Sequence, residues 1–266
     1  MDFITFWESA QAAVPPLANF QLQIVWEYRE LFLQGIKTTL GITVIAIVFG
    51  TLIGLFCGMA RLAEAKHGPW KYLLYFFVRW PATIYVTFFR GTPLFVQILL
   101  IHFAALPIFV HPDNGLFVSG DLAATLRQDY GALTSGLVAL TLNSGAYITE
   151  IFRAGIQSIH RGQFEASRSL GMDYFQTMRF VIIPQAFRRM LPPLGNEAIM
   201  LLKDSSLVSA IGLTELAFAA RTVAGTYSRY WEPYLTISLI YLVMTLALAA
   251  VVDRMEKKFK QAGGIH

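Results

Sequence analysis

Long apolar runs dominate the chain and predict helices that cross a membrane. Four segments contain no Asp, Glu, Lys or Arg: residues 38–60, 91–112, 131–149 and 233–252. At about 1.5 Å per helical residue, each run is long enough to cross, or nearly cross, a hydrocarbon layer roughly 30 Å thick. The pattern therefore predicts an all-α membrane protein.

Two further segments are apolar but carry charges or a proline. Residues 194–213 contain Glu197, Lys203 and Asp204, so this helix is expected to be shielded by other helices or to face an aqueous path. Residues 72–89 are interrupted by Arg79 and Pro81. We interpret this segment as a helix on the cytoplasmic surface or one that enters the bundle obliquely. About five transmembrane helices follow, with the two termini on opposite sides.

Composition and charge support this interpretation. Hydrophobic residues make up 55% of the chain and charged residues 14%, with a mean hydropathy of +0.52, whereas soluble domains carry about a quarter charged residues. With the N-terminus outside, most of the 21 Lys and Arg residues fall in cytoplasmic segments, as the positive-inside rule requires. These residues flank membrane spans, so topology and anionic lipid account for the net charge of +4 without nucleic acid.

The chain divides into three parts by these patterns. Residues 1–30 are expected to form an outer-surface lead-in rather than a cleaved signal, because the first ten residues lack Lys, Arg and an adequate apolar core. Residues 31–258 form the transmembrane domain, with a cytoplasmic loop at about residues 160–186. Residues 259–266 form a cytoplasmic tail.

The outer connection at residues 111–130 contains Pro, Asp, Asn and Gly, which favour turns, and a short helix is expected at residues 121–127. This connection could contact an external partner, or it could be a solvated loop without a special role. The single cysteine, Cys57, excludes an intrachain disulfide.

A polar, glycine-punctuated loop follows the third apolar run and lies in the cytoplasm in this topology. Residues 163–170 include good helix formers, Gly171 suits a left-handed cap, and Asp173 suits the start of a second helix at residues 173–180. Pro184 is expected to limit continuation of that helix. Such an elbow presents a short, rigid face that can insert into a groove on a partner.

The same loop resembles the EAA loop of ABC importer permeases. Glu165 and Ala166, Gly171 six residues after the glutamate, and the closing Pro184 carry this resemblance, while Ser167 stands where the family often has alanine. In that family the loop docks on an ATPase. The resemblance therefore implies an ATPase-coupling role for Glu165, Ala166, Gly171 and Pro184. A turn shaped by Gly171 and Pro184 alone is the plain alternative.

The resemblance also implies partners and a location. The expected partners are two ATPase subunits, an external substrate-binding protein, and a second permease subunit that is identical or homologous. The chain has no GxxxxGK[ST] phosphate loop, so no cofactor is expected on it, and ATP and Mg would be used by the partner ATPase. The expected location is the bacterial inner membrane, crossed several times.

Three further stretches resemble the polar amino-acid uptake branch of these permeases: residues 90–94, 146–156 and 203–207. Together with the loop, the resemblance covers most of the chain from about residue 35 to residue 258. It implies that a polar amino acid is moved inward by alternating access, and no catalytic or metal-binding residues are expected.

A path for such a solute needs polar groups inside the bundle. A zwitterion needs a cation or amide donors for its carboxylate and an anion or carbonyls for its ammonium group. The candidate residues for the path are Arg90, Gln97, Asn143, Glu150, Lys203 and Asp204. If each segment is one helix, a seven-residue spacing places Arg90 and Gln97 on one face, and likewise Asn143 and Glu150.

Each candidate also has a plain structural interpretation. Arg90 could be a cytoplasmic anchor at a span end. Glu150 could form an ordinary ion pair with Arg153, one helical turn away. Lys203 and Asp204 are about 100° apart on a helix and are not expected to pair directly.

Two other classes of protein compete with the importer interpretation. A secondary transporter driven by an ion gradient could use the same charged residues, but it would often show internal repeats, and no convincing repeat is found. An intramembrane enzyme would need a catalytic cluster, and the chain has no HExxH or GxSxG pattern. Both alternatives leave the cytoplasmic loop unexplained.

Overall fold

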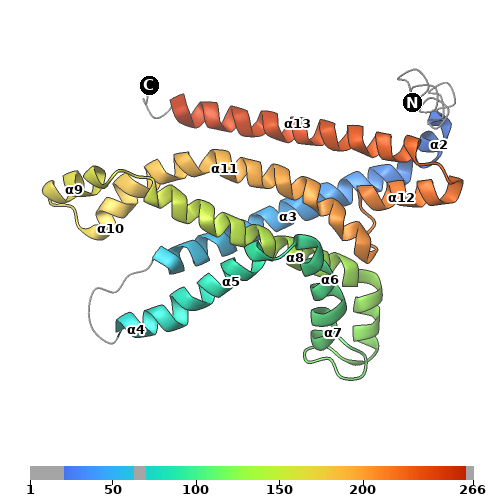
Figure 1. Cartoon of the computed structure of the whole chain (residues 1–266), viewed down its shortest axis with the longest axis horizontal. Helices are drawn as coiled ribbons and strands as arrows, with labels where there is room; N and C mark the ends of the chain where they lie inside the picture. Colours follow the sequence, from blue (N-terminus) through green and yellow to red (C-terminus); the bar gives the residue numbers. More distant parts are fainter. Residues whose placement is uncertain (1–20, 63–69, 262–266) are drawn as a thin grey trace, which may run out of the picture.

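The computed structural model describes residues 21–62 and 70–261, and all of their regular elements are helices (Figure 1). This confirms the all-α prediction for the described part of the chain. Most of the predicted lead-in and the last residues of the predicted tail lie outside the described residues.

Four long helices run alongside one another and form the body of the molecule (Figure 1). Neighbouring contacts join them in the order α3 (Arg29–Leu62), α8 (Gly120–Gln157), α11 (Ile183–Asp204) and α13 (Trp231–Gln261). The two short helices α2 (Leu22–Glu27) and α12 (Leu216–Tyr227) lie at the end of the bundle where the described chain begins. The described chain ends toward the opposite end of the bundle.

Two of these helices are long and apolar enough to cross a membrane by themselves: α3 and the Trp231–Lys258 part of α13. Two bent helix pairs also qualify when each pair is taken as one span. They are Tyr72–Gly91 with Leu94–Phe109, bent by 111°, and Tyr174–Ile211 with Leu216–Tyr227, bent by 48°. Large apolar side chains on the outer faces of α3 and α13 are exposed, as lipid-facing helices require.

The first bent pair shortens the span predicted at residues 91–112, which is helical from Leu94 to Phe109. Helix α5 (Trp80–Gly91) ends before Thr92 and Pro93, which are extended, and the chain resumes as α6 (Leu94–Leu99), η3 (Leu100–Ala105) and α7 (Leu106–Phe109). The fixed φ of proline and its effect on the preceding residue favour a helix break at this point. The segment preceding the break comprises α4 (Trp70–Leu74), η2 (Tyr75–Arg79) and α5.

Helix α8 is the central element, since it contacts α3, α5, α6 and α11. The prediction of a separate short helix at residues 121–127 is wrong, because these residues are the first turns of α8. Only the stretch from Val110 to Ser119 remains as a connection, and it is tied by a bridge between Val110 and Val118.

Small residues allow α3 and α8 to approach closely. Gly50, Gly54 and Gly58 recur every fourth residue along α3, and each faces α8. A Cβ atom at Gly50 would lie 3.2 Å from the backbone nitrogen of Gly145. Such small-xxx-small spacing is a common packing device of membrane helices, where dispersion contacts replace the hydrophobic effect.

The polar loop at residues 160–186 forms the predicted elbow. Helix α9 (Arg161–Ser169) is followed by Gly171 at φ +82°, and α10 (Tyr174–Thr177) starts with a capping box between Asp173 and Gln176. Figure 1 shows α9 and α10 projecting from one end of the bundle. The start of the second helix at Asp173 and the left-handed glycine are confirmed, whereas the first helix begins at Arg161, two residues before the predicted segment.

The role predicted for Pro184 is wrong. A π-helical segment, η4 (Met178–Ile182), precedes it, and the chain stays helical from Tyr174 to Ile211. Pro184 directly follows the π-helical segment, and the changed hydrogen-bond pattern of that segment accommodates its missing N–H.

Candidate functional site

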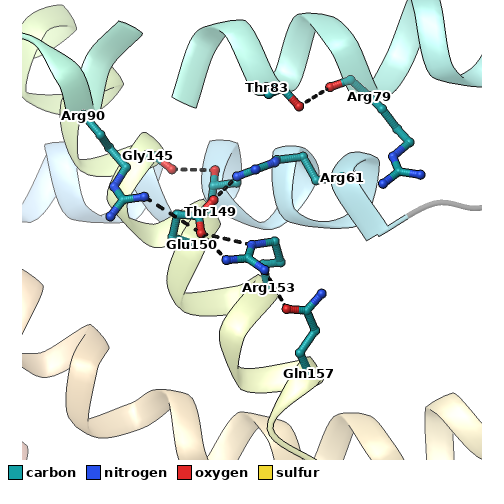
Figure 2. Close-up of polar contacts among 9 residues, drawn as sticks. All are labelled: Arg61, Arg79, Thr83, Arg90, Gly145, Thr149, Glu150, Arg153 and Gln157. Carbon is teal, nitrogen blue, oxygen red and sulfur yellow. Dashed lines mark hydrogen bonds and ion pairs between the residues drawn. The ribbon is translucent and has the colours of Figure 1, made fainter. Parts of the chain in front are cut away.

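Glu150 lies at the centre of an ion-pair network that joins three helices (Figure 2). Arg153, on the next turn of α8, donates to its Oε2 atom from Nε at 3.0 Å and from Nη2 at 2.6 Å. Arg61 from α3 donates to Oε1, and Nη1 of Arg90 from α5 lies 3.9 Å from Oε2. The ordinary pairing of Glu150 with Arg153 is therefore present, but it is part of a larger network.

A cavity of 460 Å³ adjoins this network between α5, α8 and α11. Its polar lining comes from Arg90 and Glu150, together with Arg189 and Glu197 of α11. The guanidinium group of Arg90 lies 5.3 Å from the centre of the Tyr147 ring, a cation–π contact that orients it. The cavity thus presents two cations and two carboxylates, a set that can hold both ends of a zwitterion.

The sequence places Glu197 on one helix face with Asp204, seven residues later, but Glu197 is not among the residues predicted for the path. The structure buries it, at 8% exposure, and gives it no ion pair among the described residues. A carboxylate in a membrane helix that also carries Pro192 and Pro193 is the signal that could have identified it.

Gln97 and Asn143 form a clamp across the break between α5 and α6. Nε2 of Gln97 donates to the carbonyl oxygens of Phe89 at 2.8 Å and Thr92 at 3.0 Å, and to the Thr92 hydroxyl at 2.8 Å. Nδ2 of Asn143 donates to Oε1 of Gln97 at 2.9 Å. The prediction that Arg90 and Gln97 share a helix face is wrong, because the chain turns between them.

The clamp leads to a stability prediction for Gln97, which is 2% exposed. Replacing it in Gln97→Leu leaves the Thr92 carbonyl group without its partner and removes one of the two hydrogen bonds at the Phe89 carbonyl and at the Asn143 amide, so we expect a loss of about 2–3 kcal/mol of stability. Thermal unfolding in detergent measures this loss. Gln128→Leu, at an exposed position of α8, is the matched control and should unfold with the wild type; equal stability of all three proteins would contradict the clamp.

Lys203 and Asp204 lie at the last turn of α11 and do not line the cavity. No ion pair joins them to each other, in agreement with their expected separation around the helix. Of the six residues predicted for the path, the structure therefore brings only Arg90 and Glu150 to the cavity.

Sequence reasoning also missed Glu215, a fully buried carboxylate at the start of α12. Its Oε1 atom accepts from the backbone N–H of Phe218 at 2.8 Å, and its Oε2 atom accepts from the hydroxyl of Tyr241 at 2.9 Å. It thereby caps α12 and ties it to α13. An acidic residue directly before an apolar helical run was the available signal.

The predicted coupling residues are all exposed. Glu165, Ala166 and Gly171 lie on the elbow, and Pro184 lies in α11. Ser167 is buried, and its hydroxyl donates to the Gln163 carbonyl oxygen at 2.6 Å, so serine fits where an alanine would otherwise pack.

Sequence reasoning did not single out three large side chains on the same elbow. Leu170 is 83% exposed, and the rings of Tyr174 and Phe175 are also largely exposed. Apolar and aromatic groups of this kind, gathered on a projecting elbow, are typical anchors of protein–protein contacts. The elbow therefore has both the shape and the surface of a docking element.

The fold and the site define a membrane protein with several helical spans, a charged cavity inside the bundle and an exposed helical elbow at one end. The sequence matches the family described as the inner membrane component of binding-protein-dependent transport systems, over residues 50–261. The chain belongs to this family, which confirms the resemblance found from its motifs.

Individual relatives match along nearly the whole chain. The glutamine transport system permease protein GlnP of Escherichia coli (strain K12) is 36% identical over 242 residues, which cover 91% of this chain and 99% of that protein. The probable amino-acid ABC transporter permease protein YckA of Bacillus subtilis (strain 168) is 34% identical over 240 residues, covering 90% and 94%. A crystal structure of an amino acid ABC transporter with histidines matches with a TM-score of 0.72 at 37% identity, covering 90% of this chain and 98% of that one.

Proposed function

We propose that this protein is the permease subunit of an ATP-driven ABC importer for polar amino acids. The cavity lined by two arginines and two glutamates is the observation that supports a polar amino acid as the solute. Permeases that share more than a third of its residues, GlnP among them, are components of amino-acid transport systems. Alternating access would open this cavity first to one side of the membrane and then to the other.

Within the cavity, the charges assign roles to the two ends of the solute. Arg90 and Arg189 would hold the carboxylate, because guanidinium groups pair with carboxylates through two parallel hydrogen bonds. Glu197 would hold the ammonium group, since it has no ion pair of its own among the described residues, whereas Glu150 is already engaged by arginines.

The remaining predicted path residues take different roles in this proposal. Gln97 and Asn143 support the wall of the path by holding the break between α5 and α6. Lys203 and Asp204 lie at the end of α11 that is farther from the elbow. They would line a separate, outer part of the path.

The ATPase would act on the permease through the elbow. Glu165, Ala166, Gly171 and Pro184 would lie at or next to the contact with an ATPase subunit, which uses ATP and Mg, with Leu170, Tyr174 and Phe175 as apolar anchors. Closure of two ATPase subunits would then push α10, and the uninterrupted helix from Tyr174 to Ile211 would carry that movement to the cavity. A second permease subunit, identical or homologous, would complete the pathway.

The proposed orientation places the N-terminus outside and the C-terminus in the cytoplasm of a bacterium, with the chain in the inner membrane. The distribution of Lys and Arg supports it, as does the position of the two described chain ends at opposite ends of the bundle (Figure 1). An external substrate-binding protein would then deliver the solute at the end where α2 and α12 lie.

The test begins with isolation of the tagged protein in mild detergent and identification of its partners by mass spectrometry. We expect an ATPase to copurify, and the complex in liposomes to take up a labelled polar amino acid only with ATP and binding protein present. Isolation without an ATPase, combined with uptake driven by an ion gradient, would overturn the proposal in favour of a secondary transporter.

The role of Glu197 is tested in the same liposomes. Glu197→Gln keeps the size of the side chain but removes its charge, so we expect the apparent affinity for the amino acid to fall by about tenfold or more. The control is Glu30→Gln, since Glu30 is 80% exposed at the other end of the molecule on α3. A normal affinity in Glu197→Gln with intact ATPase copurification would remove Glu197 from the site without affecting the class of transporter.

A further inference from the structure

Three arginines surround Glu150 at one end of the bundle, and a fourth, Arg79, lies beside them and points away from that carboxylate (Figure 2). We define the arginine cluster as Arg61, Arg79, Arg90 and Arg153, which come from α3, η2, α5 and α8. Among the described residues of these helices, Glu150 is the one carboxylate paired with the cluster. Arginine stays protonated in proteins, so the cluster has four positive charges against one negative charge.

Glu197 lines the same cavity as Arg90 and therefore faces the cluster from the cavity side. It offsets charge there and not on the opposite side, where Arg61 and Arg79 lie on the adjacent elements α3 and η2. The uncompensated charge is thus located between α3 and η2, which are in contact.

Arg79 is the member of the cluster whose side chain lacks a partner among the described residues. Its carbonyl oxygen accepts from the Thr83 hydroxyl at 2.7 Å, but its guanidinium group has no hydrogen bond or ion pair there. Figure 2 shows the side chain pointing away from Glu150. A half-buried guanidinium next to apolar helices is costly unless an anion pairs with it.

The surroundings of Arg79 indicate what kind of anion this is. Tyr75, Phe76, Phe77 and Trp80 are all largely exposed, with Phe77 at 75%. Because these rings cover successive positions of the helix, they point to several sides of it. Tyr, Trp and Arg grouped in this way are characteristic of the boundary between hydrocarbon and lipid headgroups. A free anion would satisfy the arginine but would leave the rings in water.

We propose that Arg79, supported by the charge of Arg61, binds the phosphate of an anionic phospholipid, with the acyl chains lying along Phe76 and Phe77. A phosphate offers the acceptor oxygens that a guanidinium group binds through two hydrogen bonds. Basic sites between membrane helices are suited to such headgroups. This site is separate from the solute cavity, so it does not depend on which solute is carried.

Native mass spectrometry of the full chain in detergent tests the proposal, with phosphatidylglycerol and phosphatidylethanolamine added in equal amounts. We expect the wild type to retain phosphatidylglycerol in preference, and Arg79→Gln to reduce that preference by about fivefold, the contribution of one arginine near an anionic surface. Arg79→Lys, which keeps the charge but not the paired hydrogen bonds, should retain an intermediate preference.

The matched control is Arg221→Gln, because Arg221 is an exposed arginine on α12 whose Nη2 donates to the Ser209 carbonyl oxygen at 3.2 Å. Arg221→Gln should retain phosphatidylglycerol with the same preference as the wild type. Equal retention of the two lipids by the wild type, or an unchanged preference in Arg79→Gln, would overturn the proposal. Displacement of the lipid by millimolar inorganic phosphate would also overturn the proposal, because that result identifies a site for a free anion. A second copy of the chain bound in place of lipid would overturn it as well, because that result identifies a protein interface.

Discussion

Gly54→Val is expected to destabilise the permease strongly. A Cβ atom at position 54 would lie 2.5 Å from Cγ2 of Ile148 and 3.0 Å from the backbone nitrogen of Thr149. The second contact is with backbone, which cannot rotate away, so α3 and α8 must separate. Overpacking of this kind costs about 3 kcal/mol or more, which corresponds to a fall of roughly 6–12 °C in Tm.

Thermal unfolding followed by size-exclusion chromatography measures the effect. Gly41→Val is the matched control, because position 41 is on the same helix and has no atom within 4 Å of the added Cβ. That variant should unfold within a few degrees of the wild type. Equal losses in both variants would show that the helix propensity of valine, and not the contact with α8, is responsible.

Gly171→Val is expected to uncouple the permease from its ATPase while leaving it folded. Gly171 adopts φ +82°, yet no atom lies within 4 Å of a Cβ added there. The substitution therefore meets no clash and acts only through backbone strain, about 1–2 kcal/mol and more for a β-branched residue. This strain is relieved most easily by changing the angle between α9 and α10, which alters the docking face.

The measurement is twofold: copurification of the ATPase, and ATP hydrolysis stimulated by the binding protein and solute. We expect both to fall by about tenfold or more, the change that 1.4 kcal/mol of lost docking energy produces, with an unchanged Tm. Gly225→Val is the control, since that glycine in α12 also has open space but lacks the positive φ. Full coupling in Gly171→Val would show that the angle of the elbow does not matter.

The class of protein and its coupling elbow could be predicted from sequence because both depend on local properties. An apolar run of about twenty residues must be shielded from water wherever it lies, so the spans of α3 and α13 follow from composition alone. The elbow follows from Gly171, which tolerates a left-handed conformation, and from Asp173, which caps the next helix. Pro184 shows the limit of such local rules, since the π-helical segment before it let the helix continue.

The solute path depended instead on how segments meet. The seven-residue spacing between Arg90 and Gln97 places both side chains on one face only if they lie on one continuous helix. The 111° bend at Pro93 shows that they do not. The bend turns Gln97 back onto Phe89 and Thr92 and makes it a structural clamp. Glu197 comes to the cavity because α11 packs against α8, a contact that no local pattern reveals.

By itself, the sequence determined that this is a helical membrane protein with a helical elbow, because apolar length and turn chemistry act over a few residues. Only the tertiary structure decided which charges share a cavity, which polar groups satisfy one another and which arginine has no partner among the described residues. Those outcomes depend on distances between residues far apart in the chain, such as Arg61 and Glu150. In a membrane, where a charge without a partner is costly, these distances determine what each polar residue does.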